Sequence, residues 1–159
     1  SQEVCFIQTE VSEFLKRHLK TNPGRIVDTQ GRVVGKHEGL WFYTIGQRKG
    51  IGLSGGPFYV LKKDVRQNLL IVTKNEKDLY SKELIAKSIN WISGKKPKLP
   101  LKVMAKIRYK HQPASARVFE EKGNKLKVVF SKPQRAITPG QSVVFYQGER
   151  LLGGGIISK

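Results

Sequence analysis

The sequence has few of the residues that most enzyme chemistry needs. Its 159 residues include one cysteine, three histidines and only 12 acidic residues. One cysteine cannot form an internal disulfide, and a tetrahedral zinc site needs about four ligands. Cys5 and the three scattered histidines have no metal-ligand spacing, so we expect no metal site. No Ser/His/Asp set and no pair of carboxylates stands out either.

The sequence also lacks a long apolar run. No stretch approaches the roughly 18 residues that a membrane-spanning helix needs. Residues 1–7 lack the basic flank and apolar core of a signal peptide. A hydrophobic fraction of 38% still supports a core, and the length fits one medium domain or two small ones. We therefore expect a cytoplasmic protein with no membrane partner.

Positive charge, in contrast, is abundant, with a formal net charge of +18. Residues 1–83 hold 14 Lys or Arg against 9 Asp or Glu, whereas residues 84–159 hold 16 against 3. Such a surplus favours a polyanionic partner for the second half. A lysine-rich surface that only maintains solubility is the alternative.

Residues 1–83 show the pattern of a small α+β domain. An apolar stripe at helical spacing predicts one short helix over about residues 9–21, and Asn22-Pro23-Gly24 ends it. The expected strands 58–61 and 69–73 flank a polar turn, which predicts a hairpin. The strands expected in this part are 25–28, 33–37, 58–61 and 69–73.

After residue 83 the pattern changes to short strands separated by turns at regular spacing. Six such strands predict a small closed antiparallel β-barrel over residues 84–159, so the fold class is mainly β. The step in charge falls at the same place and supports a domain boundary there. The expected strands are 84–92, 101–110, 114–119, 125–130, 142–146 and 151–157.

The strand expected at 101–110 has an unusual outer face. Apolar and mostly cationic residues alternate along it, so Lys106 and Arg108 should point to solvent. Tyr109, Lys110 and His111 follow at its end. A spaced row of cations can bind phosphates, and a nearby tyrosine can stack on an unpaired base. An ordinary solvent face whose lysines prevent edge aggregation is the alternative.

The glycine-rich loop at residues 44–52 is a second candidate binding segment. Its glycines allow a close approach of the backbone, and Gln47, Arg48 and Lys49 bring side-chain donors to it. The loop could bind a phosphate or be a simple turn. It lacks the Lys-Ser/Thr ending of a nucleotide-binding loop, and no expected helix follows it, so we do not expect ATP to bind there.

Three further features have simple structural interpretations. Residues 138–140 predict a turn that leads into a strand at Gln141. Gly153-Gly154-Gly155 interrupts the last strand and predicts a bulge or a tight packing site. Cys5 lies between apolar residues, where burial is more common than reactivity, and an unperturbed thiol is only slightly ionised at neutral pH.

Several segments taken together nevertheless resemble one family. In their order they are similar to segments of the tRNA-specific 2-thiouridylases, a family formerly named as methyltransferases, and the match covers essentially the whole chain. The segments around Cys5 and Gln47 are the most specific. The matching segments are Ser1-Gln2-Glu3-Val4-Cys5-Phe6-Ile7, His37-Glu38-Gly39, Tyr43-Thr44-Ile45-Gly46-Gln47-Arg48-Lys49-Gly50, Lys106-Ile107-Arg108-Tyr109, Thr138-Pro139-Gly140-Gln141 and Gly153-Gly154-Gly155-Ile156.

The resemblance implies an activity and a set of site residues. The family uses ATP with Mg to adenylate the C2 oxygen of the wobble uridine of tRNA, and then replaces that oxygen with sulfur. Cys5 matches the cysteine that accepts a persulfide from a sulfur-donor protein. The implied tRNA contacts are Arg108, Tyr109 and Gln141, with Lys106 and Lys110 beside them, and the loop of Gln47, Arg48 and Lys49 is implied to lie near the active site.

The resemblance also implies a longer protein. The family has an N-terminal ATP pyrophosphatase domain, a small central domain and a C-terminal barrel similar to domain 2 of elongation factors. This sequence lacks the ATP-binding serine-glycine loop and the first of the family's two cysteines. We therefore expect a C-terminal fragment that binds tRNA and supplies Cys5, but holds no cofactor and is inactive alone.

Two other function classes compete with this interpretation. A free-standing RNA-binding or translation-factor-like barrel would explain the basic half equally well, but not the family-like segment around Cys5. A methyltransferase is disfavoured because the sequence has no glycine-rich strand–loop–helix motif for a methyl donor.

Overall fold

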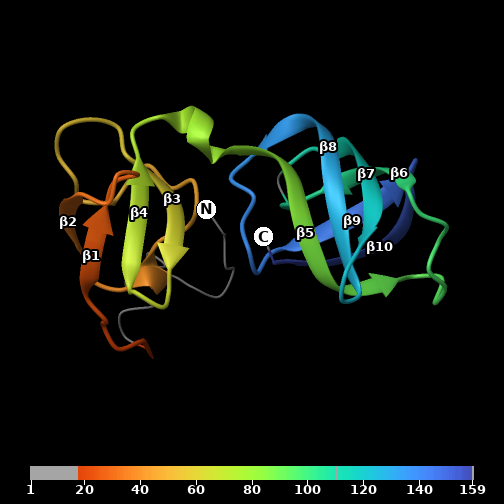
Figure 1. Ribbon diagram of the computed structural model, residues 1–159, viewed down its shortest axis with the longest axis horizontal. Helices are drawn as coiled ribbons and strands as arrows, with labels where there is room; N and C mark the ends of the chain where they lie inside the picture. The colour runs from red at the N-terminus through yellow and green to blue at the C-terminus, as the bar shows by residue number, and fades with distance from the viewer. Residues whose placement is uncertain (1–17, 110, 159) are drawn as a thin grey trace. The chain divides into compact units, whose positions relative to one another are not determined.

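The computed structural model describes residues 18–109 and 111–158. The chain divides into two compact units, with the boundary between Asp78 and Leu79, and each unit has its own hydrophobic core (Figure 1). The sequence placed the boundary near residue 83. The second unit begins earlier because its first strand already starts at Tyr80. Cys5 lies outside the described residues. Most of the expected helix at about residues 9–21 does so too, since the described part of the chain begins at residue 18.

The first unit contains a four-stranded mixed sheet in the order β2-β1-β4-β3. The predicted hairpin is confirmed as β3 and β4, which pair antiparallel. β1 pairs antiparallel with β2 and parallel with β4, so it lies in the middle of the sheet. The elements are β1 (Gly24–Val27), β2 (Val33–His37), the 3₁₀ helix η1 (Leu40–Phe42), β3 (Tyr59–Asp64), β4 (Leu69–Thr73) and the 3₁₀ helix η2 (Glu76–Leu79).

Asn68 fastens β1 to the β3–β4 hairpin. Its backbone has a φ of 52°, and its side-chain amide donates to the Pro23 carbonyl at 2.9 Å. The buried His37 ring donates through Nε2 to the Asn68 carbonyl at 3.2 Å. A Cβ atom on Gly24 would collide with both groups, so this crossing requires glycine.

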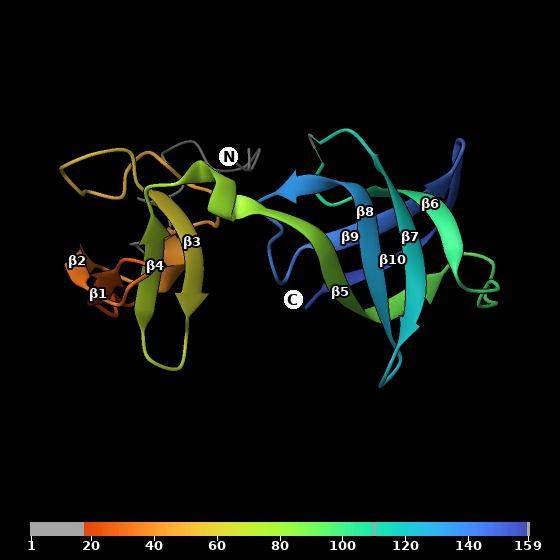
Figure 2. The same ribbon diagram turned by 45° about the horizontal axis from the view of Figure 1, so that its top comes forward.

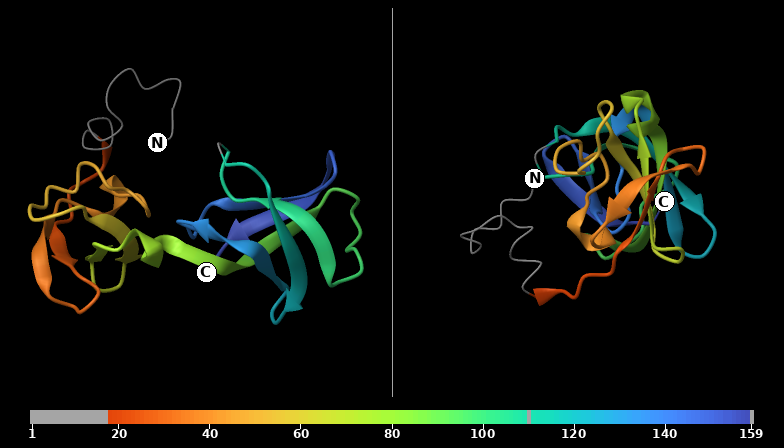
Figure 3. Two further views of the ribbon diagram at one scale, coloured as in Figure 1. Left: turned by 90° about the horizontal axis from the view of Figure 1, so that it is seen from above. Right: turned by 90° about the vertical axis from the view of Figure 1, so that its left-hand side faces the viewer.

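The second unit is a closed barrel in the strand order β10-β5-β8-β7-β6-β9, and every neighbouring pair is antiparallel. The predicted six-stranded antiparallel barrel is confirmed. Its strands curve round one core, which can be followed in Figure 2 and, from above, in Figure 3. They are β5 (Tyr80–Trp91), β6 (Leu101–Lys106), β7 (Ala114–Glu121), β8 (Lys125–Arg135), β9 (Ser142–Gln147) and β10 (Arg150–Ile157).

The barrel closes because alternate residues of each strand bury apolar side chains. Val103 and Ala105 of β6 are 3% and 1% exposed, as their alternation predicted, and Phe145 of β9 is fully buried. Several strands differ in length from the expectation: β5 begins at Tyr80 rather than at residue 84, and β7 extends to Glu121. β6 ends at Lys106 rather than at residue 110, and β8 continues past Phe130 through an irregular register opposite β5.

The three glycines of β10 have both of the roles that the sequence predicted. The pairing register shifts beside them on each side, between Leu151 and Gly153 toward β9, and between Gly154 and Ile156 toward β5. These shifts are β-bulges. A Cβ atom on Gly154 would meet the Val143 carbonyl, and one on Gly155 would meet β5, so the neighbouring strands also approach closely.

Candidate nucleic-acid interface

Arg108, just past the end of β6, is a structural anchor as well as a cation. Its Nη2 donates to the Ala136 carbonyl at 2.8 Å and to Thr138 Oγ1 at 2.9 Å. Its Nε donates to Gln141 Oε1 at 3.3 Å. The expectation that Arg108 points freely to solvent is therefore wrong, because the guanidinium is half-buried against the β8–β9 loop.

The β8–β9 loop has a conformation that presents acceptors to this guanidinium. Ala136 has a φ of 52°, and its amide donates to the Leu79 carbonyl at 2.7 Å. The Thr138 hydroxyl donates to the Ala136 carbonyl at 2.9 Å, and the Gln141 amide donates to the Thr138 carbonyl at 3.2 Å. The fold thus brings Gln141 against Arg108, although 33 positions separate them in the sequence.

Tyr109 is the most exposed large side chain of this region, with 91% of its surface accessible. The Lys106 ammonium lies 5.5 Å from the centre of the Tyr109 ring. This arrangement leaves most of an aromatic ring open to stack on a base, with a cation beside it. Lys110, the remaining predicted contact of this strand, lies outside the described residues.

Two further groups share this end of the barrel and were not among the predicted contacts. Arg135 is the last residue of β8 and precedes Ala136, while the His111 amide donates to the Arg108 carbonyl at 3.1 Å. Burial, and then the charge of Arg135, lowers the pKa of Arg108. Burial, and then the charges of Arg108 and Arg135, lowers the pKa of His111. No local motif marks this cluster, because barrel closure assembles it.

The loop of Gln47, Arg48 and Lys49 belongs to the first unit. Gln47 holds it in shape: its Oε1 accepts from the Thr44 amide at 3.0 Å, and its Nε2 donates to the Lys49 carbonyl at 2.9 Å. Arg48 and Lys49 are exposed. Gln47 is therefore a positioning residue for the loop, and the two cations are its accessible groups.

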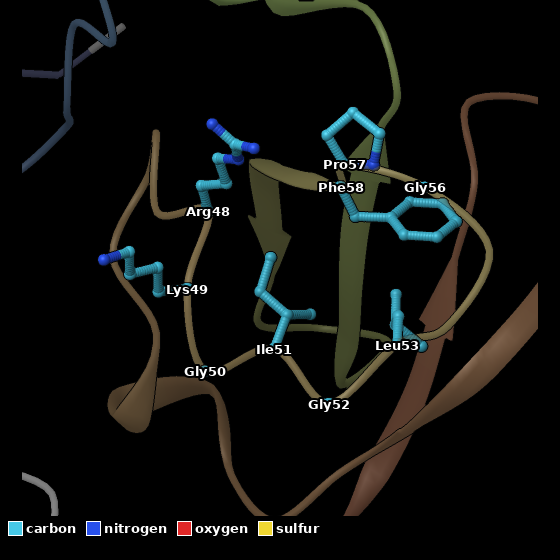
Figure 4. Close-up of a pocket in the computed structure, with 9 residues that line it drawn as sticks. All are labelled: Arg48, Lys49, Gly50, Ile51, Gly52, Leu53, Gly56, Pro57 and Phe58. Carbon is cyan, nitrogen blue, oxygen red and sulfur yellow. The ribbon is translucent and has the colours of Figure 1, made fainter.

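A pocket lies inside the turn that this loop makes (Figure 4). Ile51, Leu53 and Phe58 point into the space that the loop encircles, whereas Lys49 points away from it. The next regular element is the strand β3, not a helix. The loop therefore lacks the helix that follows a P-loop, whose first amides hold the phosphates.

Comparison with known proteins identifies the family. Residues 81–157 match the model of the aminomethyltransferase beta-barrel domain, and residues 12–74 match that of the tRNA methyl transferase PRC-barrel domain. A tRNA-specific 2-thiouridylase of Halothermothrix orenii is 48% identical over 100% of this chain and 45% of its own length. The chain belongs to the family of the tRNA-specific 2-thiouridylases.

Other thiouridylases match in the same way. The protein of Acetivibrio thermocellus is 46% identical over 99% of this chain, and that of Clostridioides difficile is 45% identical over 100% of it. In both cases the match covers 45% of the relative. The chain therefore spans less than half the length of these thiouridylases.

In the part of the chain that the structure describes, no helix has the length and apolar character to cross a membrane.

Proposed function

We propose that this chain is the central and C-terminal part of a cytoplasmic tRNA 2-thiouridylase, that it binds tRNA, and that Cys5 receives the sulfur atom. The whole-chain similarity to 2-thiouridylases carries this proposal. ATP and Mg would bind in the part of those proteins that this chain does not match, since its own glycine loop is unsuited to a nucleotide.

The end of the barrel supports tRNA binding. Lys106, Arg108, Tyr109 and Gln141 lie around one turn and one loop, and the second half of the chain carries a large surplus of positive charge. Cations neutralise phosphates and release counterions, and an exposed tyrosine can stack on a base that is not paired. The same surface would present both interactions.

The proposed role of Cys5 follows from sulfur chemistry. The terminal sulfur of a Cys5 persulfide would attack the adenylated C2 carbon, form a C–S bond and expel AMP. A second thiol, supplied by the part of the thiouridylases outside this chain, would then attack the Cys5 sulfur. That step forms a protein disulfide and leaves the sulfur on the tRNA. The chain has one cysteine, so it cannot complete this cycle by itself.

Binding of unmodified tRNA to the 159-residue chain tests the proposal. We expect salt-sensitive association, with log affinity falling by about 0.7–0.9 per log unit of salt for each phosphate contact. Tyr109→Ala should weaken binding by roughly tenfold through lost stacking, whereas Tyr109→Phe should retain most of the affinity. Trp41→Ala is the control, because Trp41 is also an exposed aromatic residue, with 39% of its surface accessible, and belongs to η1 of the first unit.

The controls separate stacking from bulk charge. If wild-type protein does not bind tRNA at low salt, the proposed function is wrong. If Tyr109→Ala and Trp41→Ala both bind as wild type does, Tyr109 is not the stacking residue. Thermal unfolding of each variant shows whether its fold is intact.

A further inference from the structure

We propose that Arg108, Arg135 and His111 form one RNA phosphate-binding site, and that His111 takes up a proton when the phosphate binds. The proposal rests on the tRNA binding proposed above and deepens it. It adds Arg135, which neither the sequence motifs nor the comparisons single out, and it gives a role to His111. It also makes RNA affinity depend on pH.

The backbone and side-chain contacts gather these three groups at one place. The Arg108 guanidinium is bonded at 2.8 Å to the carbonyl of Ala136, the residue that directly follows Arg135. The Arg108 carbonyl accepts from the His111 amide at 3.1 Å, so His111 closes the turn that Arg108 opens. The turn after β6 and the end of β8 therefore lie beside each other, and the charges of Arg108 and Arg135 both act on His111.

The charges of this grouping act on one another. A nearby like charge disfavours the charged form of a group, and all three side chains are only partly exposed. The charge of Arg135 disfavours the charged form of Arg108, and both arginines disfavour protonation of His111. A phosphodiester carries one negative charge and accepts hydrogen bonds from guanidinium groups, so it would relieve this repulsion.

His111 is the group whose charge can change in response. Burial and the two arginines lower its pKa below the ordinary 6.5, so the ring is neutral at pH 7. The charged groups that act on it are Arg108, from its own turn, and Arg135, from the end of β8. Lys106, on the strand before the turn, holds its ammonium over Tyr109. A bound phosphate would raise the pKa of His111, and its ring nitrogen would take one proton from solvent.

Linkage fixes the sign of the pH dependence. If the bound pKa exceeds the free pKa, affinity rises as the pH falls through the interval between the two values. The gain is limited to about tenfold per pH unit, because one proton is taken up per complex. We therefore expect tighter tRNA binding at pH 5.5 than at pH 7.5. The His111→Gln variant, which cannot be protonated, should lose this dependence.

The experiment measures binding of an unmodified tRNA transcript to the full 159-residue chain by fluorescence anisotropy, over a series of salt concentrations and pH values. Arg135→Ala should reduce the slope of log affinity against log salt by about 0.7–0.9. Arg150→Ala removes the same charge and serves as the control. Arg150 pairs with Gln147 at the β9–β10 turn, at the opposite end of β9 from Gln141, and should leave the slope unchanged.

Two additional measurements keep the test independent of folding. Arg135→Lys retains the charge and should retain the salt slope even if Arg135→Ala is less stable. Titration of the His111 ring signals by NMR should show a higher pKa with tRNA than without it, with His111→Gln used to assign the signals.

The outcomes distinguish this inference from the proposed function. Wild-type protein that fails to bind tRNA contradicts the proposed function itself. Wild-type binding with equal salt slopes for Arg135→Ala and Arg150→Ala overturns only the phosphate site. A His111→Gln variant that keeps the wild-type pH dependence overturns the proton uptake.

Discussion

Replacing Arg108 by alanine should destabilise the barrel, because this guanidinium fastens the β8–β9 loop to the end of β6. The variant loses the bonds from Nη2 to the Ala136 carbonyl and to Thr138 Oγ1, and the longer bond from Nε to Gln141. The Ala136 carbonyl keeps one donor, the Thr138 hydroxyl, so it is not left entirely without a partner.

The size of the effect follows from these contacts. Hydrogen bonds from a charged donor contribute about 1.5–3 kcal/mol each, and the values here lie at the low end because the site is only half-buried. Removal of Arg108 also removes two unfavourable contributions, its repulsion with Arg135 and the desolvation of its half-buried charge, and these offset part of the loss. We estimate a net loss of about 2 kcal/mol. For a domain of this size, that loss lowers the melting temperature by roughly 8–16 °C.

Trp91 provides an assay for the barrel alone. Its ring lies 5.9 Å from that of the buried Phe145, so its fluorescence reports on barrel unfolding. A Trp41→Phe background leaves Trp91 as the only tryptophan, since the chain has two. The control is Arg150→Ala, an exposed arginine whose loss should change stability by less than about 0.5 kcal/mol. If Arg108→Ala unfolds at the same temperature as Arg150→Ala, the loop is not held by this guanidinium.

Two further predictions concern other parts of the fold. In Gln47→Ala, the Thr44 amide loses its side-chain acceptor, so its hydrogen should exchange with solvent about fivefold faster. Gln67→Ala, in the β3–β4 turn, is the control and should not change that rate. Equal exchange rates of the Thr44 amide in the two variants would contradict the positioning role of Gln47. In Gly154→Ala, the new methyl group meets the Val143 carbonyl, so thermal unfolding should show a loss of about 2 kcal/mol. A Cβ atom on Gly148 would meet no other atom, and only its backbone φ of 59° disfavours a side chain, so Gly148→Ala should lose about 1 kcal/mol of stability. An equal loss in the two variants would contradict the close approach of Gly154 to the Val143 carbonyl.

The stability effect of Arg108 changes how its role in RNA binding should be measured. Arg108→Ala would weaken binding both by removing a charge and by releasing Gln141, so its affinity alone cannot identify a phosphate contact. Arg108→Lys keeps the charge but cannot reproduce the fork of donors. Comparison of the two variants separates the electrostatic contribution from the positioning of the loop.

Much of the fold was determined by local patterns in the sequence. The alternation in β6, the turn residues between the strands and the glycines of β10 depend on neighbouring residues, so the six barrel strands and the two bulges could be predicted. The β3–β4 hairpin was predicted for the same reason. The parallel pairing of β1 with β4 was not, because it joins strands that are far apart in the chain.

The candidate interface divides in a similar way. The residue types in the segments around Arg108, Tyr109 and Gln141 identified the candidates, because a family resemblance is a property of sequence. Their arrangement depended on closure of the barrel, which places the loop after β8 against the end of β6. Period-two alternation alone placed Arg108 in solvent, since it carries no information about a loop nearly thirty positions away. Local patterns and composition were enough to predict the strands, the charge and the family. The position of Arg108 against Ala136, Thr138 and Gln141 depended on the folded barrel, because contacts between distant residues set the surroundings of a charge.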